Sequence, residues 1–240
     1  MNKFAAFLGL ACMSAAATAA GPDIHILKGT VTDFEGKPIA GATIEVKDTA
    51  FEAAFSTKSD AAGHYSLKVE DGLYESITCI RMEDYGKTNL EFWAWNVPVH
   101  ADMTLDMRYD KLEVYGVNAF RVQGAQPGTM IYFRPMTFSR YPGYMEKGEP
   151  LGPSPEELDL TITVNGKHAK INAVQPVQEF AGDKPPLTAY LVHIERTGAE
   201  KPDVDTIHIV AKDKAFGDTG EAYYFWVKPD YRKPAGSSSP

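Results

Sequence analysis

The chain reads Leu27-Lys28-Gly29-Thr30-Val31-Thr32-Asp33-Phe34-Glu35-Gly36-Lys37-Pro38-Ile39-Ala40-Gly41-Ala42-Thr43-Ile44-Glu45-Val46, and this stretch decides its fold class. Apolar or β-branched residues alternate with polar ones on both sides of Glu35-Gly36-Lys37-Pro38. A period of two that is interrupted by Gly and Pro is typical of a strand, a tight turn and a second strand. Residues 57–67 repeat the pattern around Asp60-Ala61-Ala62-Gly63. The sequence therefore predicts a β-rich start to the chain.

Strand patterns continue to residue 228, and two groups of seven can be separated. The candidate strands of the first group are 26–33, 41–47, 53–58, 63–69, 73–80, 88–95 and 102–107. Those of the second group are 112–117, 129–138, 158–164, 167–174, 187–196, 204–212 and 222–228. Short strands with regularly spaced turn signals are typical of a sandwich. The longest helical candidate, Thr49 to Phe55, is too short to nucleate alone.

We therefore expect an all-β protein of two consecutive β-sandwich domains, at residues 21–108 and 109–230. Residues 142–155 contain four prolines and three glycines, so we expect a long irregular loop there, inside the second domain. Asn165-Gly166 is the strongest hairpin signal in that domain. The tail at 231–240 is expected to be disordered.

Two resemblances agree with this division. The strand pairs built around Gly29, Pro38, Gly41 and Gly63 resemble the carboxypeptidase regulatory-like domain, a small transthyretin-like β-sandwich common in secreted bacterial proteins. The pair Thr206 to Asp213 and Ala222 to Val227, which encloses a Gly-containing loop, resembles the closing hairpin of bacterial immunoglobulin-like domains. Both resemblances imply a scaffold and name no activity, because function lives in sites grafted on folds.

The first twenty residues have the pattern of a signal peptide. Lys3 is followed by an apolar run from Phe4 to Met13, and residues 17–20 supply small side chains for cleavage. The run is too short to span a bilayer, so we expect export to the periplasm or the extracellular space. Two alternatives stay open. One is a buried N-terminal helix, and the other is a lipoprotein anchored through Cys12, although Gly9 stands where the lipidation motif has Leu.

Charge and cysteine content restrict the partners. The formal net charge is -8 at pH 7 and no basic stripe is present, whereas nucleic acids and anionic lipid surfaces require clustered Lys and Arg. We therefore expect no nucleic-acid partner and no membrane span. Cys79 is the only cysteine after leader cleavage, so no intramolecular disulfide can form. Its apolar strand indicates a buried core thiol rather than a nucleophile.

Enzyme motifs are missing from the sequence. It contains no G-x-S-x-G elbow, H-E-x-x-H, P-loop or G-x-G-x-x-G motif. The six histidines include no pair at metal-ligand spacing: His25, His64, His100, His168, His193 and His208. Intradiol ring-cleaving dioxygenases carry a similar strand pair, but their iron needs an H-x-H pair that His193 and His208 do not provide. We expect no catalytic residue and no cofactor.

Asp213, Asp218 and Glu221 form a carboxylate cluster in the last hairpin, with glycines between them. Calcium often takes its oxygen ligands from such a loop, so these three residues are a weak calcium candidate. The spacing does not match the EF-hand pattern, and Asp/Gly turns form without metal.

Aromatic residues give the better binding hypothesis. Trp93 and Trp95 alternate with Phe92 and Ala94, so both indoles lie on one face of a strand. An exposed indole pair is a platform for sugar rings, whereas a buried pair is ordinary core, and the second reading is favoured because Trp is highly buried on average. The candidate ligand-binding set adds two polar residues that follow the pair and three residues just before and inside the irregular loop: Asn96, His100, Arg134, Tyr141 and Tyr144.

The function that these patterns favour is that of an exported, non-catalytic binding or accessory protein. Its partner is expected to be a carbohydrate or another cell-envelope component, and the sequence does not separate the two. A structural or assembly spacer of the envelope is the alternative. A metal-dependent enzyme built on a transthyretin-like sandwich is the last and weakest one.

Overall fold

The computed structural model describes residues 21–122, 124 and 127–228. The predicted signal peptide, Cys12 and the predicted tail lie outside these ranges. Within them the chain is built of strands with little helix, which confirms the all-β prediction. No helix in the described ranges is long and apolar enough to cross a membrane.

The first part of the chain supplies strands β1 to β8. They are β1 (Ile24–Thr32), β2 (Thr43–Lys47), β3 (Ala53–Lys58), β4 (His64–Glu70), β5 (Gly72–Ile80), β6 (Phe92–Val99), β7 (Met103–Thr104) and β8 (Met107–Arg108). Two of the turns between these strands have the same hydrogen-bond pattern. The Oδ1 atoms of Asp33 and Asp60 each accept two backbone N–H groups, from the residues two and four positions further along. These Asx turns fix the hairpin-like breaks that the sequence predicts.

The second part of the chain supplies the other elements. They are β9 (Leu112–Phe120), β10 (Gly128–Thr137), η1 (Phe138–Arg140), α1 (Tyr141–Lys147), β11 (Leu158–Val164), β12 (Lys167–His168), β13 (Ile171–Glu179), β14 (Leu187–Glu195), β15 (Val204–Asp213) and β16 (Thr219–Val227). Helix α1 corrects the expectation of a wholly irregular loop at 142–155. Pro142 is tolerated in its first turn, and Gly148 ends it in the left-handed conformation at φ 69°.

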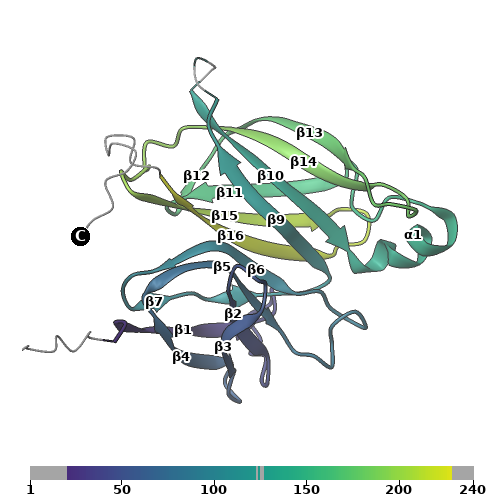
Figure 1. The fold of residues 1–240 in the computed structure, drawn as a ribbon. Coiled ribbons are helices and arrows are strands. Elements are labelled where there is room, and N and C mark those ends of the chain that lie inside the picture. The colour runs from purple at the N-terminus through teal and green to yellow at the C-terminus, as the bar shows by residue number, and fades with distance from the viewer. Residues whose placement is uncertain (1–20, 123, 125–126, 229–240) are drawn as a thin grey trace, which may run out of the picture.

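The strands form three sheets, and one of them spans the whole molecule. An eight-stranded sheet has the order β12-β11-β15-β16-β6-β5-β2-β3, and it is joined at its middle by parallel pairing of β16 with β6. A sheet of β4, β1, β7 and β8 packs on one part of it, and the sheet β13-β14-β10-β9 packs on the other part. Figure 1 shows the long sheet running between the two smaller ones. The boundary predicted between residues 108 and 109 stays a prediction, because this sheet contains strands from both sides of it.

Two hydrophobic cores result, and β6 contributes to both. Its Phe92 and Ala94 lie in the first core with Cys79, whereas Trp93 and Trp95 lie in the second. Strand β16 also contributes to both cores, because Phe225 belongs to the first core and Ala222 to the second. The two central strands are therefore buried on both faces, unlike the outer strands, which alternate between buried and exposed residues.

We predict that Gly220→Ala strongly destabilises the fold. A Cβ at Gly220 would lie 1.8 Å from the backbone oxygen of Leu112, so β9 would have to move away from β16. We expect a loss of about 3 kcal/mol in the free energy of unfolding, measured by urea denaturation. Gly72→Ala is the matched control, because its Cβ would only touch the Tyr74 ring at 3.4 Å. It should change stability by less than about 0.5 kcal/mol. Equal losses of stability in the two variants would contradict the close approach of β9 to β16 at Gly220.

Candidate functional site

Four aromatic side chains form a cluster beside the join between the two halves of the long sheet. Trp93 and Trp95 stack with ring centroids 4.7 Å apart and planes 11° apart. Tyr115 of β9 meets both indoles edge-on at 5.1 Å. Phe51, in the turn between β2 and β3, stacks against them at 5.6 and 6.4 Å. We call Phe51, Trp93, Trp95 and Tyr115 the aromatic corner.

The two tryptophans are covered in this arrangement. Trp93 is 2% exposed and Trp95 is 8% exposed, and both belong to the second core. A sugar platform needs exposed ring faces, so this geometry does not provide one and agrees with the buried reading that the sequence favours. The physical reason is the parallel pairing with β16, which brings the β9 sheet over the Trp face of β6. Phe51 remains 41% exposed at the edge of the cluster.

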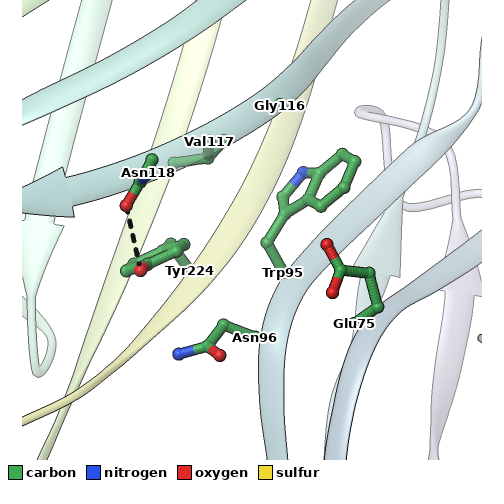
Figure 2. Close-up of a pocket in the computed structure, with 7 residues that line it drawn as sticks. All are labelled: Glu75, Trp95, Asn96, Gly116, Val117, Asn118 and Tyr224. Atoms are coloured by element: carbon green, nitrogen blue, oxygen red, sulfur yellow. Dashed lines mark hydrogen bonds between the residues drawn. The ribbon is translucent and has the colours of Figure 1, made fainter. Parts of the chain in front are cut away.

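A pocket of about 300 Å³ opens beside Trp95, and strands from both halves of the molecule form its walls. We call it the junction pocket. Its lining comes from β5, β6, β9 and β16: Glu75, Trp95, Asn96, Gly116, Val117, Asn118 and Tyr224. Figure 2 shows the Trp95 indole pointing toward β9 at Gly116, with Glu75 on one side and Tyr224 with Asn118 on the other. The pocket therefore combines an aromatic ring edge with amide, hydroxyl and carboxylate groups.

Irregular backbone shapes this pocket on two strands. Asn96 has φ 55°, an uncommon conformation for a residue other than Gly. Its Nδ2 donates to the backbone oxygen of Phe225 at 2.7 Å, just beyond the last pair of the β6–β16 ladder. Gly116 has φ 65° at the point where the pairing of β9 with β10 shifts register. Bulges and left-handed residues of this kind concentrate at functional sites.

Arg134 lies at the other side of the aromatic corner. Its guanidinium sits 4.9 Å from the centre of the Tyr115 ring and forms an ion pair with Glu179. Tyr132 donates a hydrogen bond to the same carboxylate. Four candidate residues of the sequence analysis are thus brought into one region, namely Trp93, Trp95, Asn96 and Arg134.

The other three candidates lie elsewhere. His100 Nδ1 is 3.1 Å from Asp71, which also contacts His25, and these hydrogen bonds lower the pKa of the Asp71 carboxyl. Tyr144 is buried in α1 and donates to the backbone oxygen of Pro185 at 3.0 Å. Tyr141 is half exposed and lines a separate pocket. A role for these residues in ligand binding stays a prediction.

The three candidate calcium ligands are each held by protein donors. Asp213 accepts from Arg140 at 2.6 and 3.1 Å, and Asp218 accepts from a backbone N–H at 3.1 Å. Glu221 accepts from Arg108 at 3.0 and 2.5 Å and lies 2.9 Å from His208 Nε2. In the described ranges no group of three or more His, Cys, Asp or Glu side chains is placed to hold a metal ion. The calcium hypothesis therefore gains no support from this geometry.

One buried and one partly buried carboxyl group lie beside the aromatic corner. Glu113 accepts a hydrogen bond from Trp93 Nε1 at 2.7 Å. Burial, and then the nearby Glu91 carboxylate, raise the pKa of Glu113 to about 8. Burial likewise raises the pKa of Glu91 to about 7, against the opposing effects of Lys47 and of a hydrogen bond with Tyr85. The corner therefore holds two carboxyl groups that are largely protonated at mildly acidic pH.

Several of these residues escape sequence reasoning. They come from four segments that are distant in sequence: Phe51, Glu75, Glu113, Tyr115, Asn118 and Tyr224. No local motif joins them, because the parallel contact between β6 and β16 links residues roughly 130 positions apart. The aromatic run around Trp93 was the one signal for this region.

Comparison with known proteins supports the scaffold of the first half. Residues 26–106 match the family model of the carboxypeptidase regulatory-like domain. No curated protein matches the chain significantly. Among solved structures, the major pilin subunit of Bacillus cereus is similar at 12% identity and a TM-score of 0.28, covering 85% of this chain and 69% of that one. The full-length major pilin SpaD of Corynebacterium diphtheriae is similar at 10% identity and a TM-score of 0.27, covering 89% and 70%.

Such low scores carry no functional argument, so the function has to be inferred from the site. The match of residues 26–106 confirms the first resemblance seen in the sequence. The immunoglobulin-like resemblance of the second half stays a prediction.

We predict that Glu113 makes the fold less stable as the pH rises. Its pKa is raised on folding, from a usual 4.5 to about 8. Between these values the folded state keeps a proton that the unfolded state has released. The free energy of unfolding therefore falls with rising pH, by up to about 1.4 kcal/mol per pH unit. Glu113→Gln keeps an acceptor for Trp93 and removes the charge, so it should flatten this dependence and raise the melting temperature at pH 8.

Thermal unfolding followed by circular dichroism from pH 4.5 to 9 checks this prediction. Glu70→Gln, a change of an exposed carboxylate on β4, is the control and should leave the shape of the curve unchanged. Parallel curves for the wild type and Glu113→Gln would show that Glu113 does not titrate as described.

Proposed function

We propose that this chain is an exported, non-catalytic binding protein that recognises a carbohydrate unit of the cell envelope in the junction pocket. The observation that carries the proposal is the composition of that pocket. An aromatic wall and several polar groups converge there from both halves of the molecule. Ligand sites are typically concave, with a few polar groups that fix orientation, and they favour the interface between structural units.

The polar groups of the junction pocket have donor and acceptor atoms that are not used within the described part of the chain. Asn118 is exposed, and its Oδ1 accepts from the Tyr224 hydroxyl at 3.2 Å, which leaves its NH₂ group free to donate. Asn96 donates to Phe225, which leaves its side-chain oxygen free to accept. Glu75 adds an exposed carboxylate acceptor. A sugar ring needs such a mixture of donors and acceptors for its hydroxyl groups, together with an apolar surface for its C–H groups.

The size of the pocket favours a small ligand unit. A volume of about 300 Å³ is at the lower end of the range for small-molecule sites. It suits a single terminal sugar ring better than a polysaccharide laid along the sheet. Only the edge of Trp95 is available, so orientation would depend on the amides rather than on stacking.

The same pocket favours binding over catalysis. Glycoside hydrolysis requires two carboxyl groups that flank the substrate, and Glu75 is the one carboxylate in the pocket lining. Glu91 and Glu113 are paired carboxyl groups, but Glu113 is 6% exposed and hydrogen-bonded to Trp93. These features support the assignment as a non-catalytic protein.

A structural or assembly role is the second candidate, and one observation favours it. The eight-stranded sheet runs through both halves of the molecule, so the two sandwiches form a continuous body suited to act as a spacer. A spacer has no need of a ligand. A glycan array therefore separates the two candidates directly.

We predict that a glycan array identifies a bound oligosaccharide, and that Asn118→Ala weakens its binding. Loss of one amide contact should lower the affinity about tenfold, measured by titration calorimetry with the strongest array ligand. Asn172→Ala removes an exposed amide on β13 and should leave binding unchanged. An array without ligands would favour the spacer. Binding that survives Asn118→Ala would place the carbohydrate site elsewhere.

A further inference from the structure

A second pocket, of about 290 Å³, differs from the junction pocket in its charge. It lies between the turn that precedes β6, the residue before β9, and the segment formed by η1 and the start of α1. We call it the lysine pocket. Its lining includes two lysines, two residues with aliphatic hydroxyl groups and two aromatic residues: Lys87, Lys111, Thr88, Ser139, Phe138 and Tyr141.

The lining of this pocket contains two lysines. The chain carries a formal net charge of -8, yet no Asp or Glu is among the residues that line the lysine pocket. The lysines that form ion pairs in the described part of the chain are Lys47, Lys147, Lys170 and Lys228. Lys87 and Lys111 are exposed and form none there. Two lysines and no carboxylate in the lining of one concave surface favour an anionic ligand.

The nearest acidic groups are already engaged by the protein. Asp84 forms a bidentate pair with Arg81 at 2.7 and 2.9 Å. Asp110 accepts from Asn89 at 3.4 Å, and burial raises the pKa of its carboxyl against the opposing effect of the neighbouring Lys111. Asp218 accepts from the backbone N–H of Ser139. Asp84 is therefore occupied by Arg81, whereas Asp110 is the one of these groups that an incoming anion would have to displace from Lys111.

The walls of the pocket are fixed by backbone hydrogen bonds. Phe138 donates from its backbone to the oxygen of Lys111 at 2.8 Å, and Leu90 donates to the oxygen of Asp110 at 2.8 Å. The segments that carry the two lysines are thus tied to η1 and to the start of β9. Such ties reduce the conformational entropy lost when a ligand binds.

We propose that the lysine pocket binds a carboxylate-bearing sugar, such as a uronic acid. The two ammonium groups would hold the carboxylate, and the half-exposed ring of Tyr141, with Phe138 beside it, provides an apolar surface for the sugar ring. The hydroxyl groups of Ser139 and Thr88 supply further hydrogen-bonding capacity. The site shares no residue with the junction pocket, so the test of this proposal is independent of the proposed function.

Titration calorimetry with trigalacturonic acid tests this proposal, with the fully methyl-esterified trisaccharide as the neutral probe. We expect the wild type to bind the acid at least tenfold more tightly than the ester, and to bind it more weakly as salt is raised. The double variant Lys87→Gln/Lys111→Gln should lose at least tenfold in affinity. Lys58→Gln/Lys68→Gln removes two exposed lysines on β3 and β4 and should bind like the wild type.

Three outcomes would overturn the assignment. They are the absence of binding at millimolar trigalacturonic acid, equal binding of the acid and the ester, and unchanged binding by Lys87→Gln/Lys111→Gln with a folded circular-dichroism spectrum. Asn118→Ala distinguishes the two sites. If that variant loses trigalacturonate binding while the lysine variant keeps it, the acid binds in the junction pocket and the lysine pocket is refuted.

Discussion

The parallel pairing of β6 with β16 is the contact on which the rest of the structure depends. Three residue pairs, from Ala222–Trp93 to Tyr224–Trp95, join a strand of the first part of the chain to the last strand and so complete one eight-stranded sheet. Each of the two strands then has a core on both faces, which places Trp93 and Trp95 in the second core and Phe92 in the first. Where the pairing ends, Asn96 turns away and the junction pocket opens. The join and the candidate site are therefore consequences of one contact.

Ion pairs beside the pairing of β6 with β16 also help to fix its register. The buried carboxylate of Glu221 on β16 binds Arg108 of β8 and His208 of β15, so it contacts both halves of the molecule. Removing one partner of such a pair leaves a buried charge without compensation, which costs far more than the intact pair contributes. Correct alignment of β16 is thus favoured over shifted alignments. The acidic residues around the last hairpin have a structural use here, with Asp213 held by Arg140 in the same way.

How well the sequence predicts this structure depends on how far apart in the chain the contacting residues lie. Alternation over residues 27–46 and 158–164 predicts strands because burial on one face of a sheet is a local property. Burial of Cys79 follows from its apolar strand in the same way. The parallel join leaves no local pattern, since it depends on residues far apart in sequence. Alternation at Trp93 and Trp95 shows that the indoles share a face, but what covers that face is set by β9 and Phe51. The sequence does not predict helix α1 because the many prolines and glycines of residues 142–155 lower helix propensity, whereas Pro142 and Gly148 stand at positions where a helix tolerates them.

Hydrogen exchange followed by mass spectrometry tests the central claim most directly, because it measures the opening of each strand separately. Residues 93–95 of β6 pair with residues 222–224 of β16 across the join and lie between two cores. Their amides should therefore exchange only on global unfolding, with the same free energy of opening and among the slowest in the chain. Fast exchange at β16 while β6 and β5 stay protected would show that the two halves open independently. That result would contradict a single shared sheet and, with it, the junction pocket.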